Sequence, residues 1–268
     1  MWPDGKRCAA AFTFDFDAES VWIADDPENA NRPGVLSQGT YGARVAVPLI
    51  LELLERRGVK ATFFVPGVVA ESYPDRVSAI VAAGHELAIH GFTHTSPSSL
   101  SADQEEDELV RARAVLERFS DRIVGYRSPS WDFSSNTLSL LDRLGFRYST
   151  NMMDDIRPYL HPGTGIVELP VQWVLDDAAH FWFSAAEWTK AIAAPSHVDE
   201  IWRGELEGIR RLGGCCVFTM HPQVIGRPGR LLFLESLIEH VLSLDDVWVT
   251  TLDAMAEQAR RSVEAASA

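Results

Sequence analysis

The stretch CAAAFTFDFDAE at residues 8–19 decides the fold that the sequence predicts. Its apolar first half, residues 8–12, is typical of a buried strand. Side chains alternate across a strand, so Asp15 and Asp17 share one face while Phe14 and Phe16 point to the packing side. If the strand ends near Phe16, both carboxylates project from its C-terminal end, where α/β barrels and open sheets place their chemistry.

A second stretch, HGFTH at residues 90–94, follows the apolar segment ELAI at residues 86–89. It spaces His90 and His94 four residues apart, which brings the two imidazoles together on one helical turn or in a tight loop. Gly91 allows the backbone to bend there. We expect these two stretches to form one site.

One aspartate and two histidines form a three-ligand set that leaves a position for water on a divalent ion such as Zn²⁺. The ion lowers the pKa of that water to about 7, and a second carboxylate can then accept its proton. Each stretch alone has a simpler interpretation, because loop histidines are commonly surface residues and an aspartate after a strand commonly caps a helix. Their joint occurrence favours a metal-activated hydrolase.

These two stretches and three later ones resemble the motifs of the polysaccharide deacetylase superfamily. The family order is an Asp pair, His-x-x-x-His, Arg-x-Pro, an acidic stretch and a late histidine. In this chain the last three are matched by RSPSW at 127–131, DDIRP at 154–158 and TMHP at 219–222. The resemblance covers residues 7–254, and we expect a single catalytic domain over residues 1–268.

The resemblance implies a role for each matched residue. Asp15 would be the general base, and Asp17, His90 and His94 would bind a divalent metal, with Zn²⁺ expected and Co²⁺, Ni²⁺ or Fe²⁺ open as alternatives. His221 would be the general acid. Arg127 would orient the base, a task that suits a planar guanidinium able to hold both carboxylate oxygens.

Three further expectations concern the surroundings of these residues. The carboxylate that approaches His221 is left open among four aspartates, with the first two favoured: Asp154, Asp155, Asp176 and Asp177. Glu19 is either catalytic or structural, for example as the ion-pair partner of Arg44 or Arg127. Backbone amides near Trp131 are expected to stabilise the oxyanion.

The first motif departs from the family pattern, because Phe16 separates two aspartates that are usually adjacent. This spacing resembles a branch that contains peptidoglycan-deacetylase-like, allantoinase-like and cyclic-imidase proteins. The same branch is similar at AES (18–20), LSQGTYGARV (36–45), ELPVQW (168–173) and GRPGR (226–230). Its members often form homo-oligomers, which we therefore expect here, and residues 39–42 are predicted to line the pocket or a subunit contact.

The branch implies hydrolysis of a carbon–nitrogen amide bond other than a peptide bond. The substrate is either an N-acetylated sugar, which would lose its acetyl group, or a small cyclic amide, which an allantoinase or a cyclic imidase would open. A noncatalytic ligand-binding protein is the remaining alternative, and it would require a broken base or acid position. An open groove at the pocket mouth would favour a polymer, and a closed chamber would favour a small ring.

Composition narrows the choice of partners. The chain has 24 basic and 38 acidic residues and a net charge of −14, which argues against nucleic acid and membrane surfaces as partners.

Residues 1–7 lack the pattern of a signal peptide, and no apolar run approaches the roughly 20 residues of a membrane span. We therefore expect a cytoplasmic location, which favours a small cytosolic amide or imide. Cys8, Cys215 and Cys216 are expected in the core.

Strand-like and helix-like segments alternate along the chain, which is typical of βαβ units around a parallel sheet. The strand candidates are residues 8–14, 61–65, 86–89, 123–126, 147–149, 215–219 and 247–250. Helices are predicted at 45–57, 101–119, 231–242 and 252–261. We predict an α/β fold, a single-domain distorted or incomplete (β/α) barrel with about seven parallel strands.

Two segments are expected to surround the pocket. Residues 22–40, rich in Asp, Asn, Pro and Gly, are predicted to form a long loop that serves as a functional loop or a lid. A late aromatic cluster is expected mainly in the core or at a subunit contact, with pocket lining as the alternative. It comprises Trp173, His180, Phe181, Trp182, Phe183 and Trp188.

Overall fold

Strand β1 (Cys8–Asp15) pairs with three other strands of the sheet, and all its residues are buried. The structure, a computed structural model, describes residues 2–183 and 191–267. On one side β1 pairs along its length with β8 (Cys215–Met220). On the other side its first half pairs with β9 (Val247–Val249) and its second half with β2 (Thr62–Val65). The first motif of the sequence therefore begins in a strand that is buried along its whole length.

The sheet has the strand order β6-β7-β5-β4-β3-β2-β1-β8, with β9 beside β1. The strands that continue it are β3 (Glu86–Ile89), β4 (Gly125–Tyr126), β5 (Tyr148–Ser149), β6 (Tyr159–Leu160) and β7 (Val167–Glu168). Every pairing is parallel except that of β6 with β7. On the open side, the described segment after β7 reaches β8 through an isolated bridge between Asp176 and Thr219.

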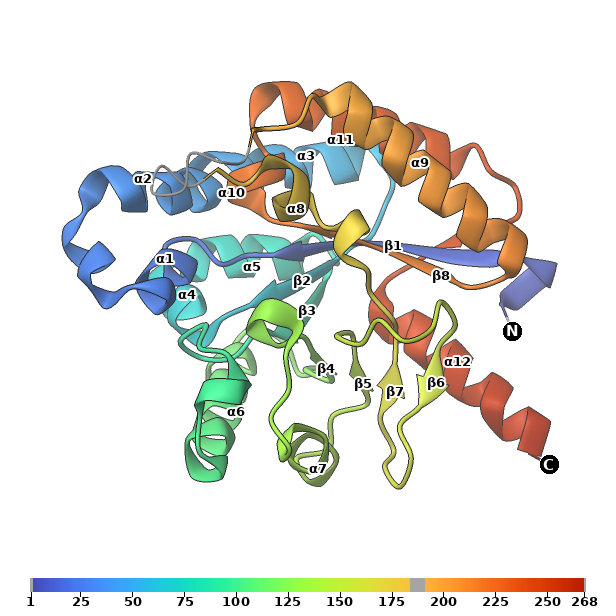
Figure 1. The fold of residues 1–268 in the computed structure, drawn as a ribbon, viewed down its shortest axis with the longest axis horizontal. Helices are drawn as coiled ribbons and strands as arrows, with labels where there is room; N and C mark the ends of the chain where they lie inside the picture. Colours follow the sequence, from blue (N-terminus) through green and yellow to red (C-terminus); the bar gives the residue numbers. More distant parts are fainter. Residues whose placement is uncertain (1, 184–190, 268) are drawn as a thin grey trace.

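This sheet curls into a half-barrel (Figure 1). The predicted distorted α/β barrel is therefore confirmed, and all seven predicted strands are present among the nine of the described sheet. The prediction from sequence lacks β6 and β7, which are short and lie in a stretch interrupted by Pro158, Pro162, Gly163 and Gly165.

Helices connect the strands and cover the sheet. In chain order they are α1 (Ser20–Asp25), α2 (Pro33–Tyr41), α3 (Val47–Arg57), α4 (Gly67–Ser72), α5 (Pro74–Ala82), α6 (Ala102–Leu116), α7 (Thr137–Arg143), α8 (Asp177–Phe181), α9 (Pro195–Leu212), α10 (Pro222–Ile225), α11 (Pro228–Leu242) and α12 (Leu252–Ser267). The four predicted helices correspond to α3, α6, α11 and α12. Helix α6 begins with a capping box at Ser101, and α3 ends at Gly58 with φ of 65°.

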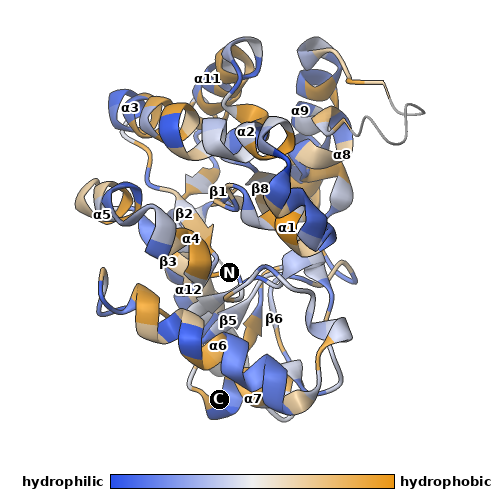
Figure 2. Ribbon diagram, turned by 90° about the vertical axis from the view of Figure 1, so that its left-hand side faces the viewer, coloured by the Kyte–Doolittle hydropathy of each residue, from blue (hydrophilic) through white to orange (hydrophobic). Residues whose placement is uncertain are grey.

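The core lies between the sheet and these helices. Helices α3, α9 and α11 lie above β1 and β8 in Figure 1, and Figure 2 shows hydrophobic and hydrophilic faces on α3 and α11. Trp202 of α9 is fully buried, with its ring 5.4 Å from Phe218 of β8 and 5.5 Å from Phe233 of α11. The three cysteines are buried and free, as expected for core residues. No helix in the described parts of the chain is long and apolar enough to cross a bilayer.

The prediction of a long loop over residues 22–40 is wrong. The segment contains α1, a 3₁₀ helix (Pro27–Asn31) and α2. Pro27 and Pro33 begin helices instead of interrupting them, because a first-turn proline lacks only an N–H that would have no helical partner. Asn29 is buried and donates to the carbonyl of Trp22 at 2.8 Å. The segment is thus a helical arm, largely exposed, with Asn29 and Gly39 as its buried residues.

Candidate active site

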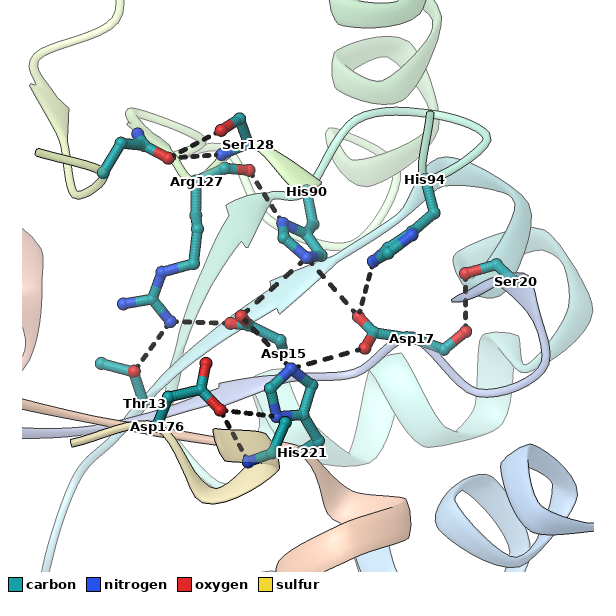
Figure 3. Close-up of polar contacts among 12 residues, drawn as sticks. Thr13, Asp15, Asp17, Ser20, His90, His94, Arg127, Ser128, Asp176 and His221 are labelled. Carbon is teal, nitrogen blue, oxygen red and sulfur yellow. Dashed lines mark hydrogen bonds and ion pairs between the residues drawn. The ribbon is translucent and has the colours of Figure 1, made fainter. Parts of the chain in front are cut away.

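Four strands deliver polar side chains to one place at the carboxyl edge of the sheet (Figure 3). Asp15 is the last residue of β1, and Asp17 follows in the connection to α1. His90, Arg127 and His221 come directly after β3, β4 and β8. Because parallel strands end at the same edge, residues far apart in the sequence meet there. The structure brings together all six residues that the sequence analysis selected.

Asp17 lies between the two histidines of the second motif. Its Oδ1 atom is 3.6 Å from Nε2 of His90 and 3.6 Å from Nε2 of His94. The ligand atoms of these three side chains all lie within 4.8 Å of one another. Oδ1 of Asp17 is buried and has no hydrogen-bond partner among the described residues. A buried carboxylate oxygen without a donor is costly unless a cation neutralises it.

The histidines are held so that their Nε2 atoms face Asp17. Nδ1 of His90 donates to the backbone carbonyl of Arg127 at 2.8 Å, which leaves the lone pair on Nε2. Glu108 of α6 holds the connection between the histidines, because its carboxylate accepts from the backbone N–H groups of Phe92 and Thr93 at 2.7 and 2.8 Å. The His-x-x-x-His segment is therefore a braced loop, which was one of the two predicted alternatives.

These donors fit a divalent cation. Two metal–ligand bonds of about 2.1 Å at a tetrahedral angle place their ligand atoms about 3.4 Å apart, close to the separations seen here. Burial, together with the nearby His90 and His221, lowers the pKa of His94, so its imidazole is neutral and able to coordinate. Burial and the neighbouring Asp15 raise the pKa of Asp17, which shows that the chain alone leaves its negative charge poorly compensated.

Asp15 lies beside this group and is held by Arg127. Nη1 of Arg127 donates to Oδ1 of Asp15 at 2.7 Å and to the hydroxyl of Thr13 at 2.9 Å. Burial acts to raise the pKa of Asp15, but the charges of Arg127 and His221 outweigh it and lower the pKa. Asp15 is therefore an ionised carboxylate, as a base must be. Arg127 contacts one oxygen of Asp15, whereas the sequence analysis expected it to hold both.

His221 faces the two aspartates from the opposite side. Its Nε2 is 4.0 Å from Oδ2 of Asp15 and 3.8 Å from Oδ2 of Asp17. Its Nδ1 donates to Asp177 at 2.7 Å, and Asp176 lies 3.9 Å away. Burial acts to lower the pKa of His221, but the carboxylates of Asp176 and Asp177 raise it well above its usual value. His221 therefore carries a proton that it can donate.

The preference for Asp154 or Asp155 as the partner of His221 is wrong. The carboxylate of Asp154 accepts from the hydroxyl of Tyr159, and that of Asp155 accepts from the backbone N–H groups of residues 156 and 157. Asp177 approaches His221 instead, because α8 begins beside the end of β8. Asp176 and Asp177 were among the four aspartates considered.

Two smaller expectations concern Glu19, which makes structural contacts, and the backbone amides near Trp131. The carboxylate of Glu19 accepts from the hydroxyls of Tyr73 at 2.6 Å and Thr40 at 2.5 Å, so it forms a hydrogen-bonded link between helices instead of an ion pair with Arg44 or Arg127. The backbone N–H of Trp131 donates to the carbonyl of Ser128 at 3.1 Å. This one amide is therefore already engaged, and the expectation for the other amides near Trp131 stays a prediction.

The connections around the site are strained. Five described residues other than glycine have positive φ, and four of them lie in these connections: Ala18, His94, Ser130 and Trp131. Such angles cost energy and persist where the surrounding structure enforces them, commonly at functional sites.

A cavity of about 210 Å³ opens onto Asp15, Asp17 and the histidines. Three indoles line it, and two of them, Trp131 and Trp173, lie with ring centroids 4.6 Å apart. The third, Trp182, stacks on Trp22 of α1 at 4.9 Å. Trp182 also borders a larger cleft of about 750 Å³, which adjoins the cavity and is lined by polar residues of α1 and the 3₁₀ helix after it.

The late aromatic cluster is divided between core and pocket. Phe181 is buried in the core, and His180 is half-buried and bonds the carbonyl of Val174. Trp173 and Trp182 line the cavity, and Phe183 lines the larger cleft. Trp188 lies outside the described residues.

Comparison with known proteins gives consistent matches. The family model described as polysaccharide deacetylase matches residues 39–149. The peptidoglycan deacetylase of Helicobacter pylori is 30% identical, over 91% of this chain and 94% of that protein.

Solved structures match over nearly the whole chain. A Mycobacterium smegmatis protein assigned as a polysaccharide deacetylase is 42% identical, with a TM-score of 0.94 over 98% of this chain and 93% of that one. The allantoinase PuuE shares the fold, with a TM-score of 0.80 and 22% identity over 96% of this chain and 91% of that one.

Proposed function

Because the chain belongs to the polysaccharide deacetylase family, we propose that it is a metal-dependent hydrolase that removes the acetyl group from an N-acetylated sugar. The observation that carries the proposal is the position of Asp17. Its unpartnered Oδ1 lies 3.6 Å from Nε2 of both His90 and His94. Asp15 and His221, which have the ionisation states of a base and an acid, lie beside it.

Asp17, His90 and His94 would hold the cation through Oδ1 and the two Nε2 atoms. A divalent cation such as Zn²⁺ bound there would polarise the amide carbonyl and lower the pKa of water. Asp15 accepts the proton from the water that attacks the carbonyl carbon, and Arg127 keeps Asp15 ionised and fixed in orientation. The contact with Arg127 uses Oδ1 of Asp15, so Oδ2 is free to face the substrate.

His221 supplies the second proton transfer. Its Nε2 faces the cavity beside Asp15 and Asp17, and Asp177 holds its Nδ1–H. As the carbon–nitrogen bond breaks, Nε2 donates a proton to the departing nitrogen, which leaves as the free amine of the sugar. The other product is acetate. Each proton removed from water by Asp15 is thus matched by one given to nitrogen by His221.

The shape of the pocket supports a sugar substrate. The 210 Å³ cavity has room for a small group, and its indole walls suit the apolar face of a sugar ring. The adjoining 750 Å³ cleft offers polar side chains to neighbouring units of an oligosaccharide. The relative from H. pylori is a peptidoglycan deacetylase. Residues of the helical arm line this cleft. A lid formed by the same residues would instead cover the opening of the cleft.

The small inner cavity also leaves a second candidate, the opening of a cyclic amide or imide. A substrate panel separates the two reactions: acetylated chito-oligosaccharides, acetylated peptidoglycan fragments, allantoin and simple cyclic imides, each with added Zn²⁺. The proposal expects acetate release from an acetylated sugar. Ring opening without acetate release would support the cyclic substrate instead, and binding of all compounds without product would indicate a noncatalytic protein.

The expected homo-oligomer and the cytoplasmic location stay predictions. The first rests on the similarity to a branch whose members often assemble, and light scattering of the purified protein would test it. Cell fractionation would test the second.

A further inference from the structure

The segment Gly39–Gly42 at the end of α2 contacts both connections that carry the candidate active site. The hydroxyl of Thr40 donates to Glu19, in the connection after β1 that contains Asp17. The hydroxyl of Tyr41 donates to the carbonyl of Gly226 at 2.8 Å, just beyond α10 in the connection after β8. These two connections are about 200 residues apart in the sequence and supply Asp17 and His221. We call residues 39–42 the bridging segment.

The two glycines of the bridging segment allow very close approach. A Cβ at Gly39 would lie 2.4 Å from the carbonyl carbon of Ala18, the residue after Asp17. A Cβ at Gly42 would lie 3.0 Å from the backbone nitrogen of Gln223 and 3.2 Å from its Oε1. Gly42 has ordinary helical angles, with φ of −53°, so its backbone conformation does not require glycine. The absence of a side chain there serves the contact with Gln223.

Gln223 in turn reaches Asp17. It is 4% exposed, and its Nε2 donates to Oδ2 of Asp17 at 3.3 Å. Oε1 of Gln223 is buried and has no hydrogen-bond partner among the described residues. A buried amide oxygen without a hydrogen bond costs free energy of folding. The side chain of Gln223 accepts this cost while its Nε2 holds the carboxylate of Asp17. With Oδ2 held by Gln223, Oδ1 of Asp17 is directed at the two imidazoles.

We propose that Gln223 is a positioning residue for Asp17, and that the bridging segment keeps Gln223 in place for this task. The inference rests on the proposed function, because Asp17 needs this orientation only as a cation ligand. Groups that hydrogen-bond to metal ligands set the ligand's orientation, and their loss typically costs 10–100-fold in metal affinity or activity. Gln223 acts through Asp17 and need not touch the substrate.

The test measures zinc affinity directly, by competition with a chromophoric chelator, in four proteins: wild type, Gln223→Leu, Gly42→Ala and Gly34→Ala. Gly34 is the control, since it lies in α2, the helix that leads into Gly42, and a Cβ there meets nothing within 4 Å. We expect Gln223→Leu and Gly42→Ala each to weaken zinc binding about 10–100-fold. Gly34→Ala should bind zinc as the wild type does.

Two further measurements separate positioning from a structural role. The visible spectrum of the Co²⁺-loaded protein reports ligand geometry and should change in Gln223→Leu and Gly42→Ala but not in Gly34→Ala. Thermal unfolding of the metal-free proteins reports whether each variant folds. The proposal would be overturned if Gln223→Leu and Gly42→Ala lowered the melting temperature but kept wild-type zinc affinity and an unchanged cobalt spectrum.

The remaining outcomes are also decisive. Wild-type zinc affinity in Gln223→Leu overturns the role of Gln223, and wild-type affinity in Gly42→Ala overturns the role of the bridging segment. Equal weakening in Gly34→Ala would overturn the inference as well, since the effect would then come from the helix and not from the contact. A wild-type protein that binds no zinc contradicts the proposed function itself, which is a different result from any of these.

Discussion

The carboxylate of Asp177 accepts a hydrogen bond from the imidazole Nδ1 of His221 at 2.7 Å and another from the backbone N–H of the same residue at 3.1 Å. This double contact fixes both the ring and the main chain of His221. It leaves Nε2 facing the cavity that contains Asp15 and Asp17. The charge of Asp177 also contributes to the raised pKa of His221.

Asp177→Asn should therefore lower kcat by about 100-fold or more, within the range that general acid catalysis contributes. Without the carboxylate the pKa of His221 falls, so the alkaline limb of the pH–rate profile should move to lower pH. Asp154→Asn is the matched control, because Asp154 is exposed and bonds Tyr159. Equal losses in both variants, or an unmoved alkaline limb in Asp177→Asn, would contradict this role.

Arg127→Met should affect activity most strongly at low pH. Arg127 opposes the burial that acts to raise the pKa of Asp15, so its removal raises that pKa. The base is then protonated over a wider range, and the acid limb of the kcat/KM profile should move to higher pH. Because Asp15 also loses its fixed orientation, we expect a loss of about 100-fold at pH 6.

Arg143→Met serves as the control for this experiment, since Arg143 is exposed and pairs with Glu106. It should show the wild-type profile. An Arg127→Met protein that is folded and active with an unmoved acid limb would show that Arg127 does not tune the base.

His85 is expected to make the protein sensitive to acid, independently of the active site. Burial, with the nearby charge of Lys60, lowers the pKa of His85 to about 4, and its Nδ1 accepts from the backbone N–H of Ala61 at 3.1 Å. The unfolded chain has a pKa near 6.5 at this residue, so between these values it binds more protons than the folded protein. Stability is therefore lost as the pH falls from 6.5 toward 4.

The substitution His85→Asn tests this role, because the amide oxygen of an asparagine side chain can accept from Ala61 and does not titrate in this range. In this variant, the decrease in unfolding free energy between pH 6.5 and pH 4.5 should be smaller than in wild type by about 2 kcal/mol. Urea unfolding at the two pH values measures this difference. Identical decreases in the two proteins would show that His85 is not the group responsible.

Local sequence was sufficient for the parts of the site that lie within a few residues of one another. Asp15 and Asp17 follow a strand marked by an unbroken apolar run, and His90 and His94 share one short connection. Long-range partners were harder. Asp177 and Asp154 are both aspartates in short acidic pairs, and only the packing of α8 beside β8 decides between them.

Two features near the site are absent from the prediction, and only one of them, the helical arm, has a signal in the sequence. Gln223 is a neutral residue outside the family's motifs, and its contact with Asp17 depends on the meeting of two distant connections. Prolines and glycines in residues 22–40 indicate a loop when taken as helix breakers, although prolines at first-turn positions favour helix starts. A helix-start signal at Pro27 and Pro33 could have revealed the arm.

The central claim is that Asp17, His90 and His94 hold a divalent cation that the reaction needs. The most direct measurement is acetate release from an acetylated chito-oligosaccharide by protein stripped of metal with a chelator, before and after stoichiometric Zn²⁺ is added. We expect activity at background without metal and its return with Zn²⁺, and His94→Ala should neither retain zinc nor recover. Full activity of the metal-free wild-type protein would contradict the account.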